Sequence, residues 1–154
     1  MTNKEILEKY YHFLNTDFNF NIEIIENSSF MLHANFLSDS VGLIFIYEFR
    51  ELSPWIQISK LDGNKLEIRP GWYKIKELYK NADFILHSFS LQDILSYKRM
   101  DNYNSYFHCA NTIEDIIIIS SELLKKYAIE FIQGDEESYF NINKWLKKQA
   151  IESH

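Results

Sequence analysis

Histidine and cysteine are the residues of this chain best suited to catalysis or metal binding, but their spacing matches no known motif. None of the five histidines lies three or four residues from another histidine or from the single cysteine, Cys109. Zinc fingers and HExxH helices require such spacings. His108 and Cys109 are adjacent, yet adjacent side chains usually point apart, whereas a nucleophile and its base must meet. We therefore expect no metal site, and we interpret Cys109 as a small buried thiol.

Paired carboxylates and glycine-rich loops also fail to indicate an active site. Acidic pairs and triplets occur at 114–115 and 135–137, where predicted helices begin and the helix dipole favours negative charge. The sequence has no dinucleotide-binding, Walker A or GxSxG motif, and four glycines leave little scope for a phosphate-binding loop. We therefore expect a protein without a cofactor and without enzymatic activity.

One histidine cluster keeps an alternative open. His33 lies on the polar side of a predicted strand near Asn35, with charged residues of the next strand across from it. Such a cluster can line a site, although a solvated sheet face has the same pattern. The alternative function is therefore a small enzyme or ligand-binding domain whose site lies around His33, His87 or His108.

The composition is typical of one folded domain. With 154 residues, 46% of them hydrophobic, the chain can form a single domain over residues 1–154 with a sizeable core. The single cysteine and the lack of an apolar stretch near the N-terminus indicate the reducing cytoplasm. No apolar run approaches the roughly 20 residues that cross a bilayer, so we expect no membrane partner. The net charge of −6 argues against nucleic-acid binding and fits either a basic partner or simple solubility.

The first half of the chain predicts a helix followed by a sheet. Thr2 and Glu5 form a capping box at the start of a helix that we expect to end near Asp17. Alternation with a period of two then predicts four strands and a short fifth strand, at 20–24, 30–37, 41–50, 55–61 and 65–68. Short connections favour an antiparallel meander. Because strand 41–50 is apolar on both sides, we expect it to be central and covered on both faces.

The second half predicts helices. Ser90 and Asp93 resemble a cap of a short helix, and residues 103–110 show no clear period, which predicts a loop or irregular strand. A long helix capped by Asn111 or Thr112 is expected to end at Gly134 with positive φ. The last helix follows, capped by Asp135, with its apolar side formed by Tyr139, Phe140, Ile142, Trp145 and Leu146. The fold class is therefore α+β: a four- or five-stranded antiparallel meander with an N-terminal helix and a C-terminal helix pair.

Apolar residues also occur on the side of the sheet that should face solvent. They are Met31, Ile44, Ile46 and Trp55. Either the middle segment or a terminal helix covers them, or they form a surface for a partner. We expect cover, because helices are predicted at both ends of the chain.

Three stretches of the chain resemble the immunity-like proteins of bacterial polymorphic toxin systems and the uncharacterised families similar to them. The first is Tyr10–Leu14 followed by Phe18–Phe20, a helix that leads through a short turn into a strand. The second is Val41–Glu51, a strand that ends in Tyr-Glu-Phe-Arg-Glu. The third is Leu123–Ala128 followed by Gly134-Asp135, at the junction of two helices. These motifs are structural, so no functional residue is carried over from the family.

The resemblance implies a non-enzymatic role in which the protein binds a cognate toxin domain and blocks its active site. Such inhibitors are often acidic because many toxin domains are basic nucleases, and the charge of this chain agrees with that. Our hypothesis for the contact residues is an acidic rim around an apolar anchor, formed by Asp39, Glu48, Glu51 and Asp62 around Trp55. A structural or adaptor subunit that assembles through the apolar sheet face is a third possibility.

Overall fold

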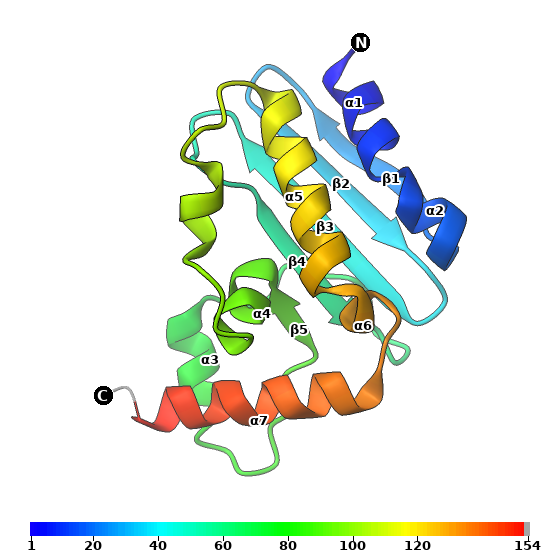
Figure 1. The fold of residues 1–154 in the computed structure, drawn as a ribbon. Coiled ribbons are helices and arrows are strands. Elements are labelled where there is room, and N and C mark those ends of the chain that lie inside the picture. Colours follow the sequence, from blue (N-terminus) through cyan, green and yellow to red (C-terminus); the bar gives the residue numbers. More distant parts are fainter. Residues whose placement is uncertain (153–154) are drawn as a thin grey trace.

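The computed structural model describes residues 1–152 and contains a sheet, seven α-helices and one 3-10 helix in that range (Figure 1). In chain order the elements are α1 (Asn3–Tyr10), α2 (His12–Phe18), β1 (Asn21–Asn27), β2 (Met31–Leu37), β3 (Val41–Glu48), β4 (Trp55–Lys60), α3 (Trp72–Leu78), β5 (Ser88–Ser90), α4 (Leu91–Tyr97), η1 (Tyr103–Phe107), α5 (Ile113–Tyr127), α6 (Ile129–Ile132) and α7 (Glu136–Glu152). No helix among these residues is both long enough and apolar enough to span a membrane.

The five strands form one antiparallel sheet in the order β1-β2-β3-β4-β5. The predicted α+β class is therefore confirmed, with β3 in the centre. Short turns join β1 to β4 as a meander, whereas α3 and two loops separate β4 from β5. A bulge between Ile24 and Glu26 interrupts the pairing of the edge strand β1 with β2.

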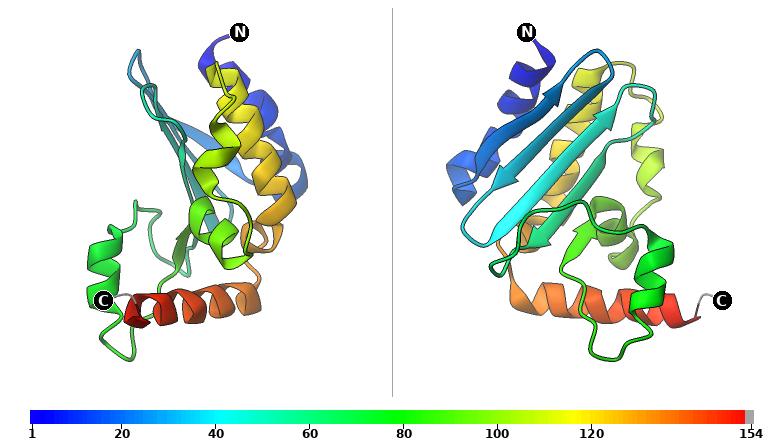
Figure 2. Two further views of the ribbon diagram at one scale, coloured as in Figure 1. Left: turned by 60° about the vertical axis from the view of Figure 1, so that its left-hand side comes forward. Right: turned by 180° about the vertical axis from the view of Figure 1, so that it is seen from behind.

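The helices that carry most of the core lie on one face of the sheet, which we call the inner face (Figures 1 and 2). α1, α2 and α5 run across this face, and α7 crosses below them against α3, α4 and α6. The apolar side chains of the inner face are Leu32, Ala34, Phe36, Val41, Leu43, Phe45, Ile56, Ile58 and Phe89. At the junction of α1 and α2 the buried Tyr11 lies 2.6 Å, hydroxyl to hydroxyl, from Ser120 of α5, so a polar contact inside the core connects the N-terminal helices to α5.

The predicted helix starts are confirmed by side-chain caps. Thr2 and Thr112 accept hydrogen bonds from the backbone three residues later, as does Ser90 at α4. Asp135 accepts from the backbone N–H of Ser138 at the start of α7. The region 103–110 was predicted to be a loop or an irregular strand; it contains the short 3-10 helix η1 and no strand.

The helix before Gly134 is shorter than predicted. α5 ends at Tyr127, because Ala128 has a φ of −121°, and the Nζ of Lys98 donates to the carbonyl oxygen of Tyr127 at 2.5 Å. The short α6 follows, and only then comes Gly134, whose φ of 74° agrees with the predicted left-handed conformation. In α7 the prediction that Phe140 faces the core is wrong, because its side chain is 65% exposed.

The predicted fifth strand at 65–68 is also wrong. This stretch crosses over β4 instead of pairing beside it (Figure 2, right). The buried amide of Gln57 donates to the carbonyl oxygen of Glu67 at 2.7 Å and accepts from the N–H of Arg69 at 3.0 Å. The edge of β4 is occupied by β5 at residues 88–90.

Candidate functional site

The face of the sheet opposite the helices, the outer face, is covered only in part. The loop of residues 61–71, between β4 and α3, lies over its β4 side (Figure 2, right). Leu66 in this loop packs so close to Gly42 that a Cβ at Gly42 would lie 2.8 Å from its Cδ1. No helix covers the outer face of β1, β2 and the upper part of β3 (Figure 2, right).

The predicted cover therefore exists for one part of the apolar surface and is lacking for another. Ile44 is buried, as expected for a central strand with both faces covered. Met31, Ile46 and Trp55 are only half-buried. His33, Ile46 and Trp55 lie in one row across β2, β3 and β4, since His33 pairs with Ile46 and Ile46 pairs with Trp55.

A hollow of about 640 Å³ opens at the end of this row, and we call it the Trp55 hollow. Its lining residues are Ile46, Glu48, Trp55, Ile68, Arg69, Pro70, Gly71, Trp72, Ser90, Gln92 and Asp93. Ile68 and Trp72 keep large apolar surfaces exposed, 57% and 37% respectively. The volume lies within the range of small-molecule and anchor-residue pockets.

A buried ion pair forms the floor of the hollow. Arg69 and Asp93 pair through Nη1 and Oδ2, and both side chains are largely buried. The guanidinium carbon of Arg69 lies 5.3 Å from the centroid of the Trp55 ring, a cation–π distance that positions the indole. Asp93 also accepts a hydrogen bond from the N–H of Ser90 at 2.9 Å. The charged groups of the floor, Arg69 and Asp93, are thus engaged in the ion pair and in the cap of α4. This leaves no free acid or base for catalysis in the floor, and the hollow is suited to binding.

The outer face also carries unpartnered buried polar atoms. Among residues 1–152, four buried side-chain atoms have no hydrogen-bond partner: His33 Nε2, Asn35 Oδ1, Trp55 Nε1 and Arg69 Nε. All four belong to strands β2 and β4 at outer-face positions or to the loop that lies over them. An unpaired buried polar group costs about 1–3 kcal/mol, so such groups in a native fold call for a physical explanation.

Acidic side chains surround this surface. Glu23 and Glu26 are exposed on β1, in register with Asn35 and His33, and Glu48 and Glu51 are exposed at the end of β3 and in the following turn. Arg50, in the same turn, and Lys65, in the loop over β4, are exposed cations on this side. The rim is therefore negative, in agreement with the net charge of −6.

The five predicted contact residues do not form one patch. Glu48, Glu51 and Trp55 lie together at the β3–β4 turn, and Glu48 and Trp55 line the hollow. Asp39 lies in the β2–β3 turn and Asp62 follows β4, so both are at the opposite end of the sheet. A strand rises about 3.3 Å per residue, so the eight residues of β3 separate Glu48, Glu51 and Trp55 from Asp39 and Asp62 by about 25 Å. The structure thus brings together only three of the five.

The three histidines of the alternative prediction, His33, His87 and His108, also lie far apart and do not form one site. His33 is on β2, whereas His87 precedes β5, three strands away, and its carbonyl oxygen accepts from the N–H of Lys60. Lys60 is five residues along β4 from Trp55, which shares a row with His33, so the two histidines are about 14 Å apart across the sheet and about 16 Å apart along the strands. His87 Nδ1 lies 4.0 Å from Asp62 Oδ2, and both side chains are about half exposed. His108 is exposed after η1, and His154 lies outside the described residues.

Two further predictions concern thiol and metal chemistry. Cys109 is exposed, so the interpretation as a buried thiol is wrong; the turn after η1 places it outside the core. Within residues 1–152, no three His, Cys, Asp or Glu side chains are arranged so that they could hold a metal ion.

Sequence reasoning missed the part of the hollow that comes from the middle of the chain. Arg69, Trp72 and Asp93 carry no periodic signal, and their proximity to Trp55 depends on the path of the 61–71 loop. One local signal could have indicated an exposed apolar surface here. Two large apolar residues, Ile68 and Trp72, lie on either side of Pro70-Gly71 in a polar stretch.

Comparison of the chain with protein-family models, with curated proteins and with solved structures gives no match. The candidate site therefore rests on the geometry described above.

Proposed function

We propose that this chain is a non-catalytic binding protein, an immunity-type inhibitor that holds a basic toxin domain against the outer face of its sheet. One observation carries the proposal. Half-buried apolar side chains and all the unpartnered buried polar side-chain atoms of residues 1–152 coincide on one partly uncovered surface. A bound protein would remove the apolar groups from water, which favours association. The unpartnered polar atoms are already shielded from solvent by the chain itself, so they show where this side of the sheet lacks internal hydrogen-bond partners and are not themselves contact atoms.

The composition of this surface supports a protein partner. Tight interfaces have aromatic anchors in a desolvated centre and polar groups at the rim. Trp55 and Trp72 line the Trp55 hollow, and Glu48 and Glu51 lie at its acidic edge. The aromatic residues would supply most of the affinity, whereas the carboxylates would accelerate the encounter with a basic surface.

The test is co-expression of the full chain with the toxin-like domain encoded next to it in the genome. We expect the chain to protect cells from growth arrest and to be recovered with the toxin domain in a pull-down. Replacing Glu48 by Gln should slow association and reduce its dependence on salt, because one steering charge is lost. Glu137→Gln is the matched control, since Glu137 is exposed at the start of α7, which lies beside Ser40 and Lys60 at the end of the sheet opposite to Glu48.

Asp39→Asn distinguishes the two ends of the sheet. If the acidic patch at the β2–β3 turn makes the contact instead, Asp39→Asn will slow association and Glu48→Gln will have no effect. If the chain neither binds nor protects and no toxin-like gene lies beside it, the proposal should be abandoned for a ligand-binding or enzymatic role. Concentration-dependent self-association in light scattering, lost on Trp55→Ala, would favour an adaptor that assembles through the same face.

A further inference from the structure

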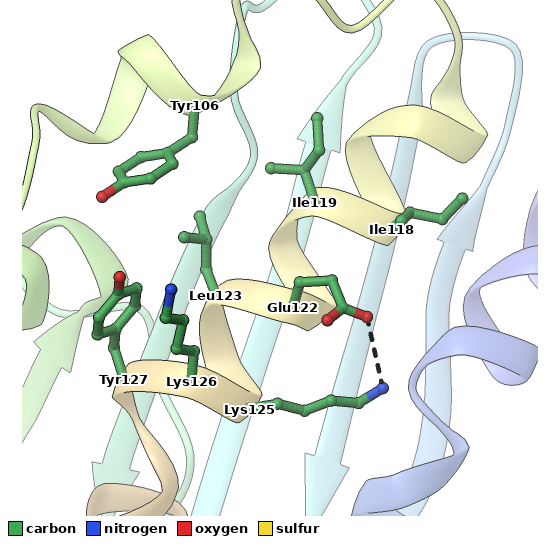
Figure 3. A pocket seen from close by; sticks show the side chains of 8 residues that line it. All are labelled: Tyr106, Ile118, Ile119, Glu122, Leu123, Lys125, Lys126 and Tyr127. Atoms are coloured by element: carbon green, nitrogen blue, oxygen red, sulfur yellow. Dashed lines mark ion pairs between the residues drawn. The ribbon is translucent and has the colours of Figure 1, made fainter.

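A second hollow lies on the helix-covered side of the molecule, between α5 and η1, and we call it the α5 groove (Figure 3). It measures about 630 Å³, and its floor is formed by Ile118, Ile119 and Leu123 of α5. Tyr106 of η1 forms the opposite wall. Ile118 and Ile119 are only half-buried, so this side of α5 presents apolar surface to the solvent.

At one end of the groove, the ammonium group of Lys126 and the hydroxyls of Tyr106 and Tyr127 have no hydrogen-bond acceptor among the described residues. The Nζ of Lys126 lies 5.4 Å from the centroid of the Tyr127 ring, and Figure 3 shows both side chains on the side of the groove that faces Tyr106. Among the described residues, Lys126 has no carboxylate within 4.0 Å, in contrast to Lys98 and Lys125 nearby. The hydroxyls of Tyr106 and Tyr127 donate to no residue of this range, unlike those of the buried tyrosines.

The charges around the groove leave Lys126 uncompensated. Lys125 pairs with Glu122 across 3.8 Å at the rim, so these two charges largely cancel. Partial burial, the neighbouring phenol of Tyr127 and the carboxylate of Asp101 raise the pKa of Tyr106, so its hydroxyl keeps its proton and can donate. In a chain of net charge −6, the groove thus ends in a free cation and two free hydroxyl donors.

We propose that the α5 groove binds an apolar segment of a partner protein and that Lys126, Tyr106 and Tyr127 hold a carboxylate of that segment. A carboxylate is the complement of an ammonium and two hydroxyl donors, and such charge-assisted hydrogen bonds are stronger than neutral ones. The three apolar side chains of the floor accommodate the apolar residues beside it. The groove is open, whereas small-molecule sites enclose most of their ligand, so a protein segment suits it better.

This surface is separate from the outer face of the sheet. α5 covers the inner face, so a segment in the α5 groove and a partner on the outer face can be bound at the same time (Figures 1 and 2). The inference does not depend on the toxin-binding proposal, and each can fail without the other.

The experiment selects ligands from a library of random dodecapeptides displayed on phage, with the full chain immobilised. Enriched peptides are then measured by fluorescence anisotropy against the wild type and variants. We expect the peptides to combine apolar residues with Asp or Glu. Lys126→Met should weaken their binding about tenfold or more, because a hydrogen-bonded charge is lost. Lys148→Met is the control, since Lys148 is also an exposed lysine and lies on α7, outside the groove.

Two further measurements locate the carboxylate. Replacing the acidic residue of the peptide by its amide should reproduce the loss, and the amide peptide should bind Lys126→Met and the wild type equally. Tyr106→Phe and Tyr127→Phe should each weaken binding severalfold while leaving the thermal unfolding midpoint unchanged. The proposal is overturned if no peptide is enriched over a blank surface, if the enriched peptides lack carboxylates, if Lys126→Met behaves like Lys148→Met, or if Trp55→Ala abolishes binding.

Discussion

Gly134 lies between α6 and α7 and next to Val41 of β3. Replacing it tests both the conformation of this helix end and its contact with the sheet. Its N–H donates to the carbonyl oxygen of Phe131 at 3.1 Å, and the N–H of Asp135 donates to that of Glu130 at 2.9 Å. This pair of hydrogen bonds is the Schellman motif, which ends a helix with a left-handed residue. The φ of Gly134 is 74°, a conformation that costs alanine about 1 kcal/mol or more.

A side chain at this position also meets the sheet. A Cβ at Gly134 would lie 3.1 Å from Cγ2 of Val41, which is buried on β3. The contact adds to the backbone strain, so we expect Gly134→Ala to lower the free energy of unfolding by about 2 kcal/mol. Gly134→Val should cost more, because its branched Cβ enlarges the clash.

Two other glycines separate the contributions. Gly63 has a φ of 84° but no atom within 4 Å of an added Cβ, so Gly63→Ala should cost the backbone strain alone, about 1 kcal/mol. Gly71 has an ordinary φ of −62° and free space, so Gly71→Ala should lie within about 0.5 kcal/mol of the wild type. The assay is urea unfolding of the wild type and the four variants. The reasoning is refuted if Gly134→Ala is neutral or costs no more than Gly63→Ala.

Other predictions concern the ion pair, the buried tyrosines and the lack of a metal requirement. Arg69→Met should destabilise the protein by about 3 kcal/mol or more, because Asp93 then keeps a buried charge without its partner; adding Asp93→Asn should restore part of the loss in urea unfolding. Burial raises the pKa values of Tyr11, Tyr79 and Tyr139 above the usual 10.0, so the folded state holds these protons more tightly than the unfolded state. Stability is therefore complete below that pH and declines as the pH rises above it; a thermal midpoint that stays constant beyond about pH 11 would contradict this. Chelator and reductant should leave the thermal midpoint unchanged, and a decrease of several degrees with chelator would show that a bound metal had been overlooked.

Local signals in the sequence were sufficient for most of the fold. The caps at Thr2, Ser90 and Thr112 act within a few residues, and the alternation of 31–37 directly reports which side chains of β2 face the helices. Gly134 was predictable for the same reason, because a left-handed helix end depends on the residue itself.

The errors concern features that depend on distant residues. The segment 65–68 crosses over β4 and is held there by hydrogen bonds to the side chain of Gln57, which no periodicity in 65–68 can reveal. The break at Ala128 is accompanied by a hydrogen bond from Lys98, thirty residues earlier in the chain. Phe140 was misplaced because α7 packs along Tyr139, Ile142 and Leu146, a stripe that leaves position 140 just outside.

The candidate site was predictable to the same limited extent. Trp55 and Glu48 could be selected from the sequence because a strand pattern places them on the outer face. The other half of the Trp55 hollow is formed by the 61–71 loop and the start of α4, which the tertiary fold brings to them. Asp39 and Asp62 satisfied the same charge criterion but lie at the other end of the sheet.

The most direct test of the proposed binding surface is the dissociation constant of the toxin complex for three aromatic variants. Trp55→Ala and Trp72→Ala remove the two indoles of the hollow, whereas Tyr73→Ala removes a neighbouring ring that is 86% exposed and outside it. We predict that each tryptophan variant raises the dissociation constant about 30-fold or more, mainly through faster dissociation, and that Tyr73→Ala changes it by less than about threefold. Equal effects of all three variants, or none from the tryptophans, would contradict the assignment of the outer face as the partner surface.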